Sequence, residues 1–272
     1  MYYLLAVGIT LLCLSVSSAQ TASILMGGRS SGLAHASACL EDEWSLFNNV
    51  AGLADLKKTA ASFTYDAQPG FASFNKMAGV FAMPIKPGIV GVGLFRFGDE
   101  LYNEQILTIG FANTYGLASL GVKVNYIQYT ASGFGSKGVF SVSFGGIAKL
   151  TEKIFVGAHV ININQPDISK NENEKLPTIL VLGIGARITT QAFFATELEK
   201  DLDHPLKWKT GIEYKPFKKF TARTGFSINP GMLFFGFGFN PTKFSLDYAY
   251  QHNFVIGSRH QATVGYFFGR RQ

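Results

Sequence analysis

Charge and long apolar runs are both scarce in this chain. Of its 272 residues only 15% are charged, although 47% are hydrophobic and the mean hydropathy is +0.17. Soluble domains usually carry more charge, so this composition favours a membrane protein. A helix that crosses a bilayer needs about 20 consecutive apolar residues, and no segment after residue 20 offers such a run. The sequence therefore excludes helical membrane spans beyond its first 20 residues.

Cysteine is nearly absent as well. Residues 1–19 hold a short apolar core followed by Ser17-Ser18-Ala19, a pattern that predicts a secretory signal cut after Ala19. No Lys or Arg precedes that core, and a lipoprotein signal at Cys13 is disfavoured because Leu12 is too large for the position before it. Cleavage would leave Cys39 alone, so the exported chain must fold without an internal disulfide.

Motifs for catalysis, metals and nucleotides are also missing. No Cys or His cluster has metal-ligand spacing, and Gly91-Val92-Gly93 and Gly183-Ile184-Gly185 lack the third glycine of a dinucleotide loop, so strand glycines in a curved barrel explain them better. We expect no enzyme activity, cofactor or metal. We also expect no nucleic acid partner for an exported chain, and the net charge of +6 is better explained by contact with anionic lipid or polysaccharide. None of the histidines lies in a serine-hydrolase motif: they are His35, His159, His204, His252 and His260.

What the chain does contain is alternation of apolar with polar or small residues, clearest from Phe193 to Phe268. Period two is the pattern of a half-buried strand. Alternating segments recur and predict about 14 strands, an even number as in bacterial barrels. We therefore predict an all-β, antiparallel transmembrane barrel over residues 59–272, after a short helical or irregular segment at 20–58. The predicted strands are 60–66, 74–85, 89–97, 104–113, 116–129, 138–149, 152–163, 177–189, 191–200, 206–215, 219–228, 231–240, 242–251 and 259–268.

The connections between these strands differ in length. Short turns containing proline are predicted to lie at one end of the barrel, and longer polar stretches fit the opposite, extracellular end. The short turns are 86–88, 215–218, 229–231 and 240–241, and the long stretches are 97–103, 130–137, 165–175 and 252–259.

The two faces of the strands are expected to differ in chemistry. Outward positions are rich in aromatic residues, which anchor barrels at lipid interfaces. Inward positions carry charges of both signs, so the preferred interpretation is a lumen with structural ion pairs, and an ion-selective filter is the alternative. The candidate lumen-facing residues are Lys123, Glu197, Lys209, Glu213, Arg223 and Asp247, accompanied by Asn125 and Glu199.

The run from Gly27 to Ala36 and the run from Leu40 to Leu53 resemble the N-terminal signature of the PorV/PorQ and FadL-like outer-membrane proteins. That signature has a glycine and arginine patch, small residues, an acidic pair, an aromatic residue and then Asn-Pro-Ala-Gly-Leu. This chain ends the signature with Asn49-Val50-Ala51-Gly52-Leu53, where Val50 replaces the usual proline. The candidate residues of an N-terminal hatch are Gly28, Arg29, Gly32, Trp44, Asn48, Asn49 and Gly52.

The C-terminal part is more similar to the PorV/PorQ proteins, through Glu197 to Leu202, Gly211 to Pro216 and Phe244 to Tyr250. The resemblance implies a 14-stranded barrel with an N-terminal hatch, in contact with the lipids of the outer membrane of a Gram-negative bacterium. It implies a non-enzymatic accessory or scaffold subunit of type IX secretion, with partners in that machinery.

The FadL-like alternative implies a transporter of hydrophobic small molecules, which would bind a hydrophobic ligand. Phe193, Phe234 and Phe267, on the otherwise polar face, support this alternative, but the preferred interpretation of these rings is that they pack against the hatch. A lumen filled by paired charges would exclude it.

Overall fold

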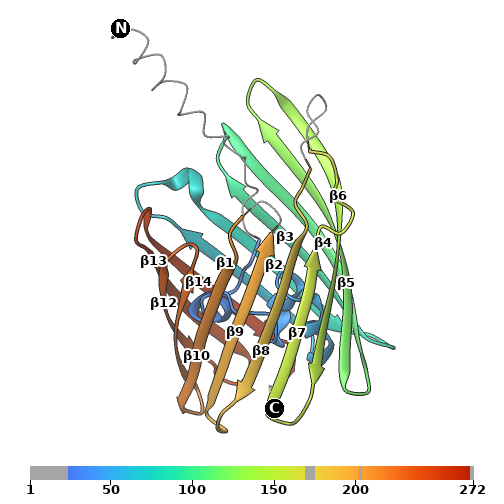
Figure 1. The fold of residues 1–272 in the computed structure, drawn as a ribbon, viewed down its shortest axis with the longest axis vertical. Helices are drawn as coiled ribbons and strands as arrows, with labels where there is room; N and C mark the ends of the chain where they lie inside the picture. Colours follow the sequence, from blue (N-terminus) through green and yellow to red (C-terminus); the bar gives the residue numbers. More distant parts are fainter. Residues whose placement is uncertain (1–23, 169–174, 202–203, 270–272) are drawn as a thin grey trace, which may run out of the picture.

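The computed structural model describes residues 24–168, 175–201 and 204–269, and the predicted signal peptide at 1–19 lies outside this part. Fourteen strands form one closed barrel, in which each strand pairs antiparallel with its sequence neighbours and β1 pairs with β14. The fold prediction is therefore confirmed. Figure 1 shows the N-terminal segment, in blue, inside the barrel. None of the helices in the described ranges is long and apolar enough to span a bilayer.

All fourteen predicted strands overlap an observed strand, with ends that differ by a few residues. The start of the second was wrong, because residues 72–74 form a single turn of 3-10 helix, η3 (Ala72–Phe74), before the strand. The strands are β1 (Ala60–Ala67), β2 (Lys76–Pro84), β3 (Ile89–Gly98), β4 (Tyr102–Tyr115), β5 (Ala118–Ala131), β6 (Gly135–Lys149), β7 (Ile154–Ile161), β8 (Ile179–Arg187), β9 (Ala192–Asp201), β10 (Lys207–Phe217), β11 (Phe220–Ile228), β12 (Met232–Phe239), β13 (Phe244–Asn253) and β14 (Gly257–Phe267).

Side chains alternate between the outer surface and the lumen, as the sequence pattern requires. In β12 the outward residues Leu233, Phe235 and Phe237 are exposed, whereas Phe234 between them is buried. An apolar outer face is favourable only in hydrocarbon, and the closed sheet leaves no unpaired strand edge there.

Connections alternate between the two ends of the barrel, which we call the short-turn end and the long-loop end. The strand ends that flank the long stretches lie at one end, and the turns at 86–88, 215–218 and 240–241 lie at the other. The placement of 229–231 at the short-turn end was wrong. In an up-and-down barrel, the connection from an odd-numbered to an even-numbered strand always falls at the same end, so the β11–β12 turn joins the long loops whatever its length.

Residues 24–58 lie inside the barrel, and we call this segment the hatch. It contains α2 (Gly28–Gly32) and two short 3-10 helices, η1 (Glu43–Leu46) and η2 (Val50–Asp55). The main hydrophobic core forms where η1 and η2 meet β2–β6. Its members include Leu46, Phe47, Val50, Leu53, Ala78, Val80, Ile89, Phe95 and Ile106.

Inward-facing strand glycines let the hatch backbone touch the wall. A Cβ on Gly211 would lie 2.8 Å from Leu33 Cα, and one on Gly121 would lie 2.9 Å from Ala51 N. Close approach to the hatch, rather than barrel curvature alone, accounts for the glycines of this belt. The other strand glycines that would press on hatch atoms are Gly91, Gly93, Gly110, Gly145, Gly157, Gly183, Gly185, Gly225 and Gly236.

Candidate functional site: the hatch and the cavity beside it

The turn of η1 is fixed by its own side chains. Asp42 caps the helix, because its Oδ1 accepts from Trp44 N at 3.1 Å while Ser45 Oγ accepts from Asp42 N at 3.2 Å. Reciprocal bonds of this kind satisfy two backbone donors that a helix start leaves free. The Trp44 ring is buried and stacks on Phe47, with ring centroids 6.2 Å apart.

Two consecutive asparagines hold separate parts of the hatch together. Asn48 Oδ1 accepts from Met26 N at 3.2 Å and Asn48 Nδ2 donates to Met26 O at 3.0 Å. Asn49 caps η2 by accepting from Ala51 N at 3.2 Å, and it donates to Ala38 O at 2.7 Å. These amides therefore replace backbone pairing that the irregular segment lacks.

The positions of Gly52 and Val50 differ in the residue types that they can accept. A Cβ on Gly52 would lie 2.1 Å from Leu40 O, so only glycine fits. Val50 is the first residue of η2, where proline is favoured but not required because the first N–H of a helix has no intrahelical partner. Replacement of the usual proline by Val50 therefore leaves this helix start intact.

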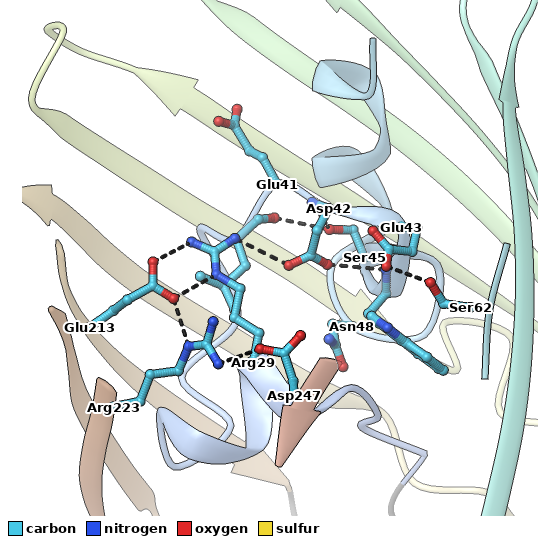
Figure 2. A network of polar contacts seen from close by, with 12 residues as sticks. Arg29, Glu41, Asp42, Glu43, Ser45, Asn48, Ser62, Glu213, Arg223 and Asp247 are labelled. Carbon is cyan, nitrogen blue, oxygen red and sulfur yellow. Dashed lines mark hydrogen bonds and ion pairs between the residues drawn. The ribbon is translucent and has the colours of Figure 1, made fainter. Parts of the chain in front are cut away.

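Arg29 connects the hatch to the barrel wall, as Figure 2 shows. Its Nε lies 3.0 Å from Glu213 Oε2 on β10, and its Nη1 lies 3.2 Å from Asp42 Oδ2. Arg223 on β11 continues the network, with Nε 2.7 Å from Glu213 Oε2 and Nη1 2.6 Å from Asp247 Oδ1 on β13. Burial opposes the charge of Arg29, but the two carboxylates hold its pKa above the ordinary value.

The two helix glycines bring α2 against this charged wall. A Cβ on Gly28 would lie 2.9 Å from Asp247 Cβ, and Gly28 N donates to Thr263 Oγ1 at 2.9 Å. A Cβ on Gly32 would lie 3.1 Å from Gly236 Cα. The glycine and arginine patch therefore combines close backbone contact with an ionic bond to the wall.

Lys123 makes a different contact. It is 1% exposed, and its Nζ donates to the carbonyls of Leu46 at 3.0 Å, Phe47 at 2.6 Å and Asn48 at 3.3 Å. Within the described ranges it forms no ion pair, so it differs from the paired lumen charges that we expected. An ammonium group at the end of η1 satisfies carbonyls that the short helix leaves free.

Glu197 and Lys209 join β9, β10 and the hatch. Glu197 Oε2 accepts from Ser37 N and Ala38 N, both at 2.8 Å, while Glu197 Oε1 lies 2.9 Å from Lys209 Nζ. Lys209 Nζ also lies 2.5 Å from Glu199 Oε2. Lys207 Nζ lies 2.9 Å from Glu199 Oε1 and balances the second carboxylate, so these buried charges are compensated, and Glu197 also holds the hatch.

The hatch separates two cavities. One, of about 450 Å³, lies toward the long-loop end, and hatch residues Ile24, Leu25, Ala34 and His35 line it together with the wall. The other, of about 210 Å³, lies toward the short-turn end and is lined by Arg29, Cys39, Glu41, Phe193 and Glu213 among others. We call them the upper and lower cavities.

The upper cavity has both apolar and polar walls. Apolar surface comes from Ile24, Ile106, Ile127, Leu176 and Phe234, and polar surface from Asn125, His159, Glu199, Lys209 and Arg259. Burial, together with the charges of Lys209 and Lys76, lowers the pKa of His35 to about 3, so this hatch side chain stays neutral. Burial likewise raises the pKa of the Cys39 thiol to about 12, which makes the thiol unreactive.

The three inward phenylalanines do not form a single pocket. Phe234 lines the upper cavity and packs against His35, with ring centroids 6.0 Å apart. Phe193 lines the lower cavity and packs against Phe155. Phe267, at the end of β14, is buried and lines neither cavity.

Sequence reasoning missed the side chains that shape the upper cavity. Ile106, Ile127 and His159 all sit at inward strand positions, where the alternation could have placed them. Alternation gives the face of a residue, but it does not give its height in the barrel relative to residues on distant strands. Only the assembled barrel shows that these residues surround one space.

Solved structures with a similar fold come from one group of barrels. No family model and no curated protein matches this chain. A TodX deltaS2S3 mutant, a monoaromatic hydrocarbon channel, shares 12% identity with a TM-score of 0.70, and the match covers 89% of this chain and 98% of that one.

Two further solved structures are similar over almost the same extent. The CymD monoaromatic hydrocarbon channel shares 12% identity at a TM-score of 0.67, covering 92% of this chain and 99% of that one. A FadL homologue from Pseudomonas aeruginosa shares 13% identity at a TM-score of 0.65, covering 91% and 100%. The chain therefore has the fold of FadL-like barrels, whereas its likeness to PorV/PorQ proteins rests on the sequence motifs alone.

Proposed function

We propose that this protein is a non-enzymatic, FadL-like transporter of hydrophobic small molecules in the outer membrane of a Gram-negative bacterium, with the hatch as its gate. The observation that carries the proposal is the upper cavity of about 450 Å³, which has a largely apolar lining and lies directly on the hatch. Paired lumen charges leave this space free, so the condition that would have excluded transport is not met. The hydrocarbon channels with the same fold support the same function.

The orientation follows from the connections. Bacterial barrels place short turns in the periplasm and longer loops outside the cell. The upper cavity would then receive a compound from the outside, and the lower cavity would lie on the periplasmic side. Passage between them requires the hatch to rearrange, because hatch residues line both cavities, Ala34 and His35 the upper one and Arg29 and Cys39 the lower one.

Filling the upper cavity tests this proposal. Ile106→Trp would place a large ring in the space, whereas Ile109→Trp, on the same strand but 52% exposed on the outer face, is the matched control. Cells that depend on this protein for uptake of a radiolabelled monoaromatic compound should lose most of that uptake with Ile106→Trp and keep it with Ile109→Trp. Equal uptake by both variants, at equal amounts of folded barrel, would contradict a route through the cavity.

An accessory role in type IX secretion has no support beyond the resemblance in sequence, and it stays a prediction. Gentle detergent extraction followed by mass spectrometry separates it from transport. Recovery of secretion-machinery proteins would favour the scaffold role, and a solitary barrel that carries a hydrophobic compound would favour transport.

A further inference from the structure

Within the described residues, four side chains in the wall of the upper cavity have buried polar atoms without a hydrogen-bond partner. Two of them, Asp66 and Arg259, form an ion pair with each other, and the other two, His159 and Asn125, are uncharged. Both ring nitrogens of His159 are buried and unpartnered within the described residues, and the ring is 4% exposed. Asn125, 1% exposed, uses its Oδ1 to accept from Thr108 Oγ1 at 2.8 Å, but its Nδ2 has no acceptor among the described residues. Native proteins rarely leave such groups unsatisfied unless they have a function.

Both of these uncharged side chains lie in the wall of the upper cavity. His159 and Asn125 occupy inward positions on β7 and β5 and line the same space. The bond from Thr108 fixes the Asn125 amide, which leaves Nδ2 as the free end. His159 offers one donor and one acceptor when neutral, and Asn125 Nδ2 offers donors. The wall of the cavity therefore holds both donors and acceptors for a polar group.

Charged groups in the same wall are already compensated. Lys209 lies within 2.9 Å of both Glu197 and Glu199, and Lys207 lies 2.9 Å from Glu199. Arg259 Nε lies 3.5 Å from Asp66 Oδ1. Lys76 and Asp201, which complete the charged part of the lining, also have partners. An ionised ligand would have to compete with these pairs, whereas a neutral polar group would not.

From this arrangement we infer that the upper cavity selects amphiphiles with an apolar body and one uncharged hydrogen-bonding head, such as an alcohol or a phenol. The inference rests on the proposed transport function and narrows its substrate class. Ile106, Ile127 and Phe234 contact the apolar body, and His159 receives the head, with Asn125 Nδ2 as a further donor in the same wall. A site built for hydrogen bonding discriminates strongly against an analogue that lacks the polar group, because its own polar atoms then stay unpaired.

Three compounds with one carbon skeleton test the inference: butylbenzene, 4-phenylbutan-1-ol and 4-phenylbutanoate. Their affinities are measured by displacement of a fluorescent apolar probe from the purified full-length barrel. We expect the alcohol to bind at least tenfold more tightly than either the hydrocarbon or the carboxylate. Equal affinities, or a preference for the carboxylate, would overturn the inference and leave the transport proposal standing. Failure of all three to displace the probe would count against transport itself.

Variants at His159 separate recognition from folding. His159→Leu should abolish the preference for the alcohol while leaving affinity for butylbenzene unchanged, and His159→Gln, which keeps a donor and an acceptor, should retain part of it. His252→Leu, on β13 and outside the cavity lining, is the matched control and should behave like the natural protein. A preference that survives His159→Leu would show that this residue does not receive the head.

Discussion

The hatch contacts the barrel by two unlike surfaces. Toward β10–β13 the contact is ionic, through Arg29, Glu213, Arg223 and Asp247. Toward β2–β6 it is mainly apolar, through the core around Leu46 and Phe47, and Lys149 at the end of β6 adds ion pairs to Glu41 and Asp55. The two surfaces hold one short segment of chain, which has little regular secondary structure of its own.

The two kinds of contact respond differently when the hatch moves or a partner is removed. Apolar burial stabilises the folded state in proportion to the buried area, and it does not depend on the direction of each contact. Small displacements of the hatch therefore change its stabilising free energy little. A buried ion pair depends on every partner, since removing one leaves a charge without compensation. We therefore infer that the apolar side anchors the hatch. The ionic side sets the position of the hatch and is the side that can detach from the wall.

The largest expected effect comes from breaking the anchor. Phe47→Ala removes a fully buried ring and should lower the free energy of unfolding by about 3–5 kcal/mol. Thermal unfolding in detergent measures the loss. Phe140→Ala, on the lipid-facing surface with its ring 62% exposed, is the control and should cost far less. Similar losses in both variants would mean that the hatch core does not stabilise the barrel.

A second change breaks the ionic side. Arg29→Met leaves Asp42 and Glu213 without their shared guanidinium, and because Arg29 is 26% exposed the cost should be about 2 kcal/mol rather than the full cost of a buried charge. Amide hydrogen exchange should accelerate over 28–35 and stay slow over 46–53. Lys215→Met, which removes a cation 3.7 Å from the same Glu213, is the milder control. Uniform acceleration along the hatch would argue against a releasable ionic side.

Lys123 is a charged wall residue that contacts the apolar side of the hatch and, within the described residues, forms no ion pair. It therefore sharpens the comparison between the two sides. Lys123→Met removes the donor to three carbonyls but also removes a buried charge, so the net loss should be about 1 kcal/mol. Exchange should accelerate at 46–49, measured in the same experiment as above. A loss as large as that of Phe47→Ala would show that the ammonium group, not the apolar core, anchors η1.

The smallest effect concerns the exposed end of the hatch. Partial burial opposes ionisation of Asp55, but Lys149 at 3.1 Å and Lys57 at 3.3 Å hold the pKa of Asp55 below its ordinary value. A lowered pKa in the folded state stabilises the protein above the unfolded pKa, and this contribution disappears as the pH falls through the folded value. Since Asp55 is 38% exposed, the contribution should be below about 1 kcal/mol. The difference in unfolding free energy between the natural protein and Asp55→Asn should shrink between pH 6 and pH 3.

Much of the architecture could be predicted from local patterns. The alternation in β12 and β13 depends only on neighbouring residues, and it placed each strand and each face correctly. The signature from Gly27 to Leu53 marked residues that lie together in the hatch, including Arg29, Asn49 and Gly52. Each of these three has a contact or a steric requirement that its residue type explains.

Other contacts could not be predicted, because they join segments distant in sequence. Arg29 meets Glu213 across 184 positions, and Gly211 is required by the backbone of Leu33. The tilt and stagger of the strands decide which inward residues share a level. For the same reason, the upper cavity and the carbonyl partners of Lys123 could not be predicted from the sequence.

The sequence by itself determined the number of strands, the face of each residue and the presence of an N-terminal segment unlike the rest, because these depend on period, turn residues and composition. Only the tertiary structure decided the end at which 229–231 lies, the division of the hatch contacts into an ionic and an apolar side, and the unpartnered state of His159 within the described chain. Those properties arise when a closed barrel brings distant strands around one space, and no local pattern encodes that geometry.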